Sequence, residues 1–368
     1  MTQKTAIHDM QGIETLRKEF RIDPHLIRRL RIDFFKHFRG SASALEALPT
    51  SIRESFAKRV DFHPLESAKR FDSQQDGASK ILFQTRGGQL LESVVLRAET
   101  GRVTLCVSSQ VGCAAACAFC ATGKMGIAID LTAAEIIDQL VQASEQLRTE
   151  GKVVRNVVFM GMGEPFHNEA EVFAALDAMQ APSGLNYGPG RILVSSVGLP
   201  VSMLRCATRF PRVNLALSLH SVRQSTRERL IPLARLHPVD ELREALVALN
   251  QLQQQPVMIE HLLLEGENDS LEEAAELVAW LTGLRVYVNL IPYNPIEETP
   301  WLSPTSKTNR LAFAAVLKAA GFPTTMRYSM GRDIEAACGQ LVRHENRAIA
   351  AALRAESRQN DNPKRGLI

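Results

Sequence analysis

Three cysteines within eight residues place the strongest constraint on what this chain can fold into. They are Cys113, Cys117 and Cys120, spaced as C-x3-C-x2-C, and they follow Gly112 and the apolar run 103–108. A thiolate is a soft, anionic ligand, so three of them on one short loop can converge on one inorganic centre. Ordinary iron–sulfur clusters take four cysteines, so a triplet leaves one iron open to a small molecule.

Two other interpretations of the triplet compete with a cluster. Structural zinc is four-coordinate and usually combines a C-x2-4-C pair with a second pair or with histidines. The chain has six cysteines but no second close pair, which favours a cluster over zinc. The thiols could also be inert and buried.

The residues around the triplet resemble the radical S-adenosylmethionine (SAM) enzymes and, more narrowly, the RlmN/Cfr family of RNA adenine methyltransferases. Phe119 directly precedes the last cysteine, as in that superfamily. The matching blocks follow the family's order: Thr104–Cys113, Gly161–Pro165, Ser218–His220, Asn289–Pro295 and Gly331–Leu341. The resemblance implies that Cys113, Cys117 and Cys120 hold a [4Fe-4S] cluster whose fourth iron binds the amino and carboxylate groups of SAM.

Short apolar runs alternate with helical patterns after the triplet. Thr132-Ala-Ala-Glu135 predicts a capping box at a helix start. Strands are predicted at 153–160, 191–195, 213–219, 257–264, 286–291 and 324–328, with helices at 169–179, 239–252, 271–281 and 307–320. Apolar strands that alternate with helices indicate an α/β fold with a covered parallel sheet. The resemblance implies a partial (β/α)6 radical SAM barrel with a small N-terminal helical accessory domain.

The sequence suggests four consecutive regions. Residues 1–75 are expected to form the accessory domain, since the pattern from Gln11 to about Arg70 is helical and basic. Residues 76–97 read as a hairpin linker with a glycine turn. Residues 98–341 form the predicted core with a C-terminal catalytic cysteine, and residues 342–368 a charged tail, helical and then disordered.

Several matched positions are expected at the carboxyl ends of strands, where binding groups collect in such sheets. The resemblance implies SAM contacts at Gly163, Glu164, Ser195, Ser218, Leu219, His220 and Asn294, with Ser196 as the alternative to Ser195. Each has a plainer interpretation. The glycine loop could be only a tight turn, His220 a core histidine, and Asn294 a turn former.

Two further cysteines and one acid complete the expected site. The resemblance implies that SAM methylates Cys338, that a 5′-deoxyadenosyl radical activates this methyl group, and that the resulting radical adds to adenine. It also implies that Cys106 releases the product and leaves a disulfide bond, and that Glu92 accepts the proton. Alone, each cysteine reads as a buried thiol and Glu92 as an exposed acid on an edge strand. Cys206 is expected to be a packed helical thiol.

Composition adds limits on partners and location. The net charge is +3, with cations concentrated between Arg28 and Arg59, which suits either a solvated helix face or a phosphate-contacting face. No run of about 18 apolar residues occurs, so no membrane association is expected. The cysteine usage indicates a reducing, cytoplasmic setting.

The resemblance implies methylation of adenine C2, with C8 as the alternative, in 23S rRNA and also tRNA. It implies an electron donor such as flavodoxin or ferredoxin. Two other functions remain open: a radical SAM enzyme that acts on a different macromolecule, and a zinc-containing RNA-binding protein without catalysis.

Overall fold

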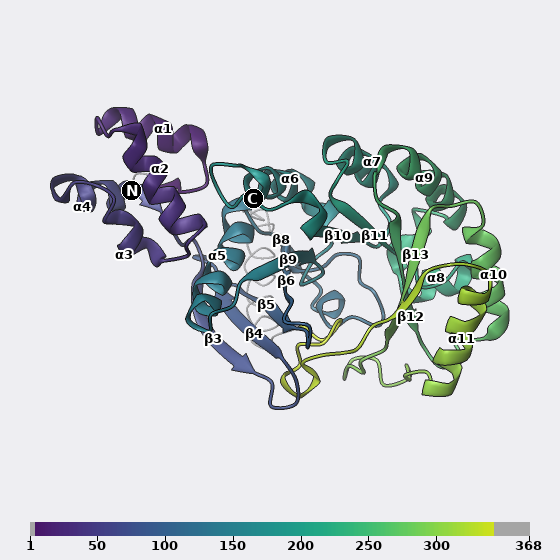
Figure 1. Ribbon diagram of the computed structural model, residues 1–368. Helices are drawn as coiled ribbons and strands as arrows, with labels where there is room; N and C mark the ends of the chain where they lie inside the picture. Colours follow the sequence, from purple (N-terminus) through teal and green to yellow (C-terminus); the bar gives the residue numbers. More distant parts are fainter. Residues whose placement is uncertain (1–3, 342–368) are drawn as a thin grey trace, which may run out of the picture.

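One ten-stranded open sheet runs through the protein (Figure 1). The computed structural model describes residues 4–341, so the predicted tail at 342–368 lies outside the described residues. Seven neighbouring strands are parallel: β6 (Val103–Val107), β9 (Val154–Phe159), β10 (Ile192–Ser196), β11 (Asn214–Ser218), β12 (Val257–Leu263), β13 (Val286–Pro292) and β14 (Thr324–Met326). Three strands continue the sheet in antiparallel pairing: β5 (Leu90–Arg97), β4 (Ala78–Gln84) and β3 (Glu66–Asp72).

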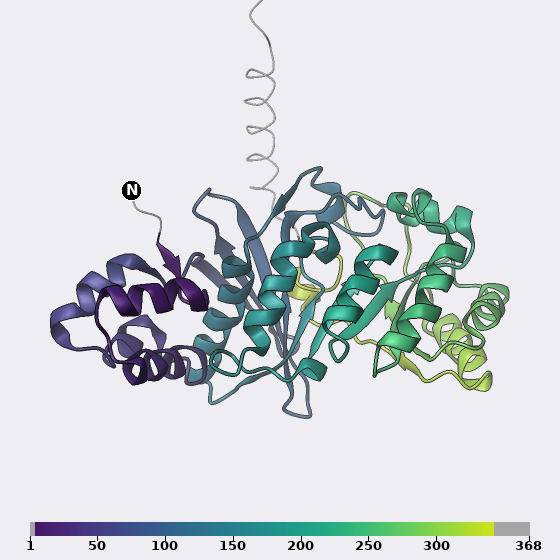
Figure 2. The same cartoon turned by 90° about the horizontal axis from the view of Figure 1, so that it is seen from above.

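A long helix follows each of the first six parallel strands. They are α5 (Ala133–Thr149), α6 (Glu169–Gln180), α7 (Pro200–Arg209), α9 (Val239–Leu252), α10 (Leu271–Leu281) and α11 (Lys307–Ala319). Figure 2 shows these helices side by side along the sheet. The six strand–helix units confirm the predicted α/β fold and partial (β/α)6 arrangement, and β14 adds one more parallel strand.

Local sequence explains these elements well. Every residue of β12 is buried, as expected for a parallel strand covered on both faces. The predicted capping box is present at α5, where Glu135 N–H donates to Thr132 Oγ1 (3.2 Å) and Thr132 N–H donates to Glu135 Oε2 (2.8 Å). These paired bonds satisfy backbone donors that the first helical turn otherwise leaves free.

The N-terminal region forms a helical module at one end of the sheet (Figure 1). It contains α1 (Met10–Glu19), α2 (Pro24–Phe35), α3 (Gly40–Leu45) and α4 (Thr50–Arg59), with the short parallel pair β1 (Thr5–Ala6) and β2 (Val60–Asp61). Leu30, Phe34 and Phe56 are fully buried within it. These side chains belong to one apolar cluster that continues into the main core.

The helical pattern expected up to Arg70 is wrong at its end. The last helix stops at Arg59, and Glu66–Asp72 is the strand β3, paired with β4. Most of the β3 side chains are exposed, so the segment carries no apolar repeat that could identify it locally. Its charged residues suit an edge strand, because charge discourages pairing with another chain.

The predicted hairpin is present as β4 and β5. It forms an interior part of the main sheet, because β3 and β6 pair on its two outer sides. Strand pairing continues across the expected domain boundaries at 75/76 and 97/98, because β3 pairs with β4 and β5 pairs with β6. The expected division of the chain at these two positions stays a prediction. In the described part of the chain, no helix is long and apolar enough to cross a membrane.

Candidate active site

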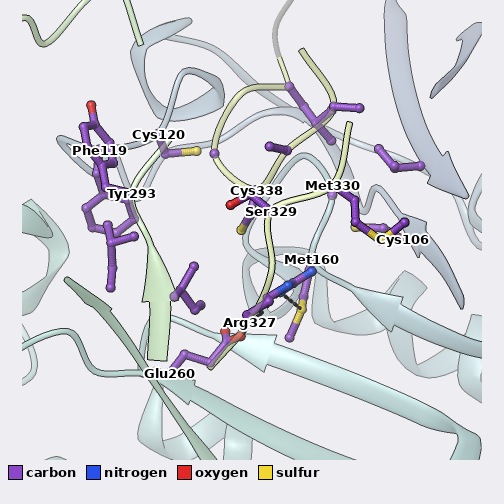
Figure 3. Close-up of a pocket in the computed structure, with 18 of the residues that line it drawn as sticks. Cys106, Phe119, Cys120, Met160, Glu260, Tyr293, Arg327, Ser329, Met330 and Cys338 are labelled. Carbon is purple, nitrogen blue, oxygen red and sulfur yellow. Dashed lines mark hydrogen bonds and ion pairs between the residues drawn. The ribbon is translucent and has the colours of Figure 1, made fainter. Parts of the chain in front are cut away.

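A pocket opens where the parallel strands end, and five of the predicted site residues line it (Figure 3). Its walls come from β5, β6, β11, β12 and β13, from the cysteine loop, and from residues 327–341, which we call the Cys338 strap. The lining includes Cys106, Cys120, Ser218, His220 and Cys338. The structure therefore brings together residues from across the matched blocks.

The cysteine loop is fixed by backbone contacts on both sides. It leaves β7 (Gln110–Gly112), and Ala118 N–H donates to Leu230 O (2.8 Å), at the end of α8 (Gln224–Leu230). On the other side, Ala121 N–H donates to Gly339 O (2.7 Å) and Thr122 Oγ1 donates to Leu341 O (2.5 Å). The loop is thus held between α8 and the Cys338 strap.

The three loop thiols lie close enough to influence one another's ionisation. Burial, with the nearby Cys120 as a smaller cause, raises the pKa of Cys113 to about 12. Burial also raises the pKa of Cys117 well above its usual value, with added contributions from Cys113 and Cys120. Such thiols become thiolates when cationic iron compensates their charge. The donor set therefore fits an iron–sulfur cluster, with Cys113, Cys117 and Cys120 as its ligands.

Within residues 4–341, no group of three His, Cys, Asp or Glu side chains is placed to hold one metal ion. A [4Fe-4S] cluster would bind each of the three loop thiolates through a separate iron atom.

The glycine loop after β9 packs tightly against the turn that precedes the cysteines. Gly163 has φ +103°, and a Cβ atom there would lie 2.7 Å from Gln110 Cβ. Glu164 is buried, and its carboxylate accepts hydrogen bonds from Val197 N–H (2.9 Å) and Phe166 N–H (3.1 Å). Burial raises the pKa of Glu164 to about 7. This carboxylate also contributes to the raised pKa of Cys113, so it lies near the cluster loop.

Ser195 and Ser218 converge on an acid that the sequence analysis did not single out. Their Oγ atoms are 3.2 Å apart, and they donate to Glu260 Oε2 over 2.7 and 3.0 Å. The three residues lie on the neighbouring strands β10, β11 and β12. An acid inside the apolar run 257–263 was the signal that could have identified Glu260. The alternative Ser196 accepts a hydrogen bond from Gly198 N–H (3.1 Å).

Leu219 and His220 form the turn that follows β11. Leu219 N–H donates to Glu260 O (3.0 Å), while His220 adopts φ +62° and accepts from Leu262 N–H at Nδ1 (3.0 Å). Burial lowers the pKa of His220 well below its usual value, so the ring is neutral. Its edge packs on Phe119, with the ring centroids 4.8 Å apart. His220 is thus a hydrogen-bonded buried histidine and also part of the pocket wall.

A buried arginine on α8 connects these strand ends. Arg227 donates to Ser218 O (3.2 Å), to Leu219 O (2.7 Å) and to Val197 O (2.5 Å). It is fully buried, and burial lowers its pKa to about 10. The sequence analysis missed Arg227, because a helical arginine ordinarily faces water.

Asn294 holds the strap that carries Cys338. Its Nδ2 donates to Cys338 O (3.1 Å), and its Oδ1 accepts from Arg332 Nε (3.0 Å). Cys338 as a whole residue is exposed, but its side chain lies in the pocket, with Cys120 among its neighbours (Figure 3). Burial of the thiol there raises its pKa to about 11, while the Arg327 guanidinium acts in the opposite direction.

Cys106 lies on β6 and faces the same pocket. It is buried, and burial raises its pKa to about 12, with Arg327 again opposing the shift and Cys338 adding to it. Arg327 therefore lies close to both thiols, and it was missed from sequence. All six cysteines are free, so the Cys106–Cys338 disulfide is not formed in this structure. Cys206 is fully buried in α7, as predicted.

Glu92 is in the interior of the sheet, so its interpretation as an exposed acid on an edge strand is wrong. Its side chain is fully buried on β5, and Lys80 Nζ lies 3.3 Å from its Oε1. Ser108 Oγ donates to the Glu92 backbone carbonyl (2.6 Å). Glu92 had looked like an edge residue because the hairpin was expected to be a linker, whereas β5 pairs with β6 of the main sheet.

Comparison with known proteins identifies the family. Residues 107–278 match the model of the Radical SAM superfamily. A probable RNA methyltransferase of Rhodopirellula baltica is 50% identical, over 96% of this chain and 91% of that protein. A probable dual-specificity RNA methyltransferase RlmN of Thermus thermophilus is 40% identical, over 86% of this chain and 88% of that protein.

A solved structure agrees with these relatives. The crystal structure of a radical SAM methyltransferase from Sphaerobacter thermophilus superposes with a TM-score of 0.87 at 37% identity, over 92% of this chain and 99% of that chain. These similarities decide between a cluster and zinc in favour of the cluster, with SAM as the second cofactor. The chain belongs to the RlmN/Cfr family of radical SAM RNA methyltransferases.

Proposed function

We propose that the protein methylates a ring carbon of adenine, C2 rather than C8, in 23S rRNA, with tRNA as a second substrate. The observation that carries the proposal is the shared pocket of Cys106 and Cys338, which lies beside the cluster ligand Cys120. The description of relatives named RlmN as dual-specificity RNA methyltransferases supports two RNA classes, and the choice of C2 rests on the resemblance of the sequence motifs to that branch of the family.

The target atoms require a radical route. C2 and C8 of adenine carry hydrogen and no nucleophilic lone pair, so they cannot attack the SAM methyl group directly. When bound, the cluster supplies the electron that cleaves SAM to a 5′-deoxyadenosyl radical. The protein's task is to bind SAM, orient the methyl-bearing sulfur and move a proton.

The described residues suit these tasks. Glu164 and the Ser195–Ser218–Glu260 group supply carboxylate and hydroxyl oxygens for the polar end of SAM, next to the cluster loop. Gly163 and Leu219 shape the backbone around them, and His220 and Asn294 fix the adjoining wall. We assign SAM binding to this set, as expected from the resemblance.

The two thiols divide the transfer between them. The Cys338 sulfur accepts a methyl group from one SAM. A hydrogen atom of that methyl group would pass to the radical that a second SAM supplies, so that the carbon can bond to the adenine ring. The adduct would then return one electron to the cluster and lose one proton, which Glu92 accepts. The Cys106 thiolate then attacks the Cys338 sulfur and forms a disulfide. This attack breaks the bond between that sulfur and the transferred carbon, which keeps the electron pair and takes up a proton to complete the methyl group. Arg327, close to both sulfurs, favours their anionic forms.

The same proposal includes an electron donor such as flavodoxin or ferredoxin and a cytoplasmic location. Each turnover needs an electron for the cluster and a reductant for the disulfide. Both are available in a reducing compartment.

Two cysteine variants test the chemistry. We expect Cys338→Ala to assemble the cluster but to contain no protein-bound methyl group. We expect Cys106→Ala to accumulate a covalent enzyme–RNA adduct, because the step that releases the RNA is missing. Cys206→Ala is the matched control, since Cys206 is a buried thiol outside the pocket.

The measurements are intact-protein mass spectrometry, electrophoresis of the adduct, and methyl mapping of the RNA. Retained RNA methylation by Cys338→Ala, or release of product by Cys106→Ala without an adduct, would contradict the assigned roles. Mapping of 23S rRNA and tRNA from cells with and without the protein tests the substrates. Methylation at C8, or no change in either RNA, would contradict that part.

A further inference from the structure

Lys80 is a buried lysine that belongs to the same sheet face as the pocket. On β4 it pairs with Val94 of β5, and Val94 pairs with Cys106 of β6. Directly paired residues project to the same face of a sheet. Because Val94 and Cys106 line the pocket, this register places Lys80 on the pocket-facing side, two strands from the Cys106 thiol.

Glu92 lies on that same face of the sheet, two residues before Val94 on β5. Alternate residues of a strand share a face, so Glu92 projects to the same side as Val94, toward the pocket. Ser108 Oγ donates to the Glu92 carbonyl (2.6 Å), which places Glu92 beside the carboxyl end of β6.

The Lys80 ammonium connects this acid to the Cys338 strap. Its Nζ lies 3.3 Å from Glu92 Oε1 and donates to the backbone carbonyl of Glu335 (3.2 Å), three residues before Cys338. The Lys80 and Glu92 side chains are 5% and 0% exposed. A buried charge is costly without a partner, so the pair fixes both groups in one geometry.

The strap has other attachments to the β3–β4 turn. Ser73 Oγ donates to Asp333 Oδ1 (2.8 Å), and Gly331 N–H donates to Asp76 Oδ2 (2.8 Å). Removal of the Lys80 ammonium therefore leaves the strap anchored. What is lost is a contact that joins the strap to the Glu92 carboxylate.

We propose that Lys80 is a positioning residue for proton transfer. It holds the Glu92 carboxylate in a fixed place relative to Cys338, so that the acceptor reaches the hydrogen on the adducted ring carbon. The inference rests on the proposed function, which assigns proton removal to Glu92. The proton passes from the ring carbon to Glu92, and Lys80 neither gains nor loses one.

The test compares Lys80→Met with Lys80→Arg. We expect Lys80→Met to load a methyl group on Cys338 as the unmodified protein does and to keep its KM for RNA. Its kcat should fall about 100-fold, the lower range for loss of a well-placed general base, with covalent enzyme–RNA adduct accumulating. Lys80→Arg keeps a cation, so its kcat should be at least about tenfold higher than that of Lys80→Met.

The matched control is Lys69→Met on the neighbouring strand β3. Lys69 is exposed, and its ammonium contacts the ring of Phe71, 4.7 Å from the centroid, a ring that Lys80 also approaches at 5.7 Å. We expect full activity from Lys69→Met. If Lys80→Met turns over normally, or loses RNA affinity with no adduct, the positioning role is refuted.

Two further variants separate this proposal from the one on which it rests. If Glu92→Gln retains normal turnover, the assignment of Glu92 as the acceptor fails. If Glu92→Gln traps the adduct and Lys80→Met does not, only the role of Lys80 fails. Lys80→Met/Glu92→Gln removes both charges, so it folds without an uncompensated charge. It should still trap the adduct, and normal turnover by it would overturn the proposal.

Discussion

Replacement of Arg227 by methionine should loosen the SAM side of the pocket and lower stability by a calculable amount. Arg227 is fully buried and joins the ends of β10 and β11 through three backbone carbonyls. Methionine fills a similar space but donates no hydrogen bond. The end of β10, which carries Ser195, and the turn that carries His220 would then be joined only through their other contacts.

Opposing effects set the magnitude. The two shorter bonds, to Leu219 O and Val197 O, stabilise by roughly 2 kcal/mol each as bonds to a charged group. Burial lowers the pKa of Arg227 from 12.5 to about 10, a cost of about 3 kcal/mol that methionine removes. The two carbonyls left without a donor cost roughly 1 kcal/mol each. The two lost bonds and the two carbonyls without a donor together cost about 6 kcal/mol, and removal of the buried charge recovers about 3 kcal/mol. The free energy of unfolding should therefore fall by about 3 kcal/mol.

Thermal unfolding and SAM binding measure these effects. For a chain of this size the loss corresponds to a fall in Tm of roughly 4 °C, and SAM affinity should weaken at least about tenfold. Arg229→Met is the control, since Arg229 lies on the same helix in an exposed pair with Glu267 and such pairs contribute about 0–1 kcal/mol. Equal Tm values for the two variants would refute the reasoning.

Three other perturbations have defined outcomes. Gly163→Ala should impair SAM binding by at least about tenfold in a calorimetric titration, because its Cβ would lie 2.7 Å from Gln110 Cβ at a φ of +103°; an unchanged affinity would contradict the fit. Burial lowers the pKa of His261 from 6.5 to about 4, so the unfolded chain binds the proton more readily and stability falls as pH drops from 6.5 to 4. The full loss is about 3 kcal/mol, and urea unfolding of His261→Gln should show a smaller pH dependence than that of the unmodified protein. Asn294→Ala removes the bond to Cys338 O and should slow methyl loading of Cys338 about tenfold while cluster content stays constant; loading at the normal rate would argue against the tether.

The strand–helix order was predictable because each parallel strand is a short apolar run with its own helix behind it. The positions predicted for α9 and α10 agree with the structure residue by residue. β3 could not be predicted in this way, since its exposed side chains carry no apolar repeat and only its pairing with β4 makes it a strand. Glu92 looked like an edge residue for a different reason, because the pairing of β5 with β6 is a tertiary contact that the local sequence does not show.

The sequence by itself determined the cysteine loop and the order of the strand–helix units, because local spacing and apolar pattern carry that information. The pair Cys106 and Cys338 was expected only from the resemblance of their matched blocks to the family. Only the tertiary structure decided that Glu260 joins two serines, that Arg227 bridges two strand ends, and that Lys80 reaches a carbonyl 255 positions away. A buried charge has to find its partner in space. That partner depends on strand register and packing, which no local stretch of the chain encodes.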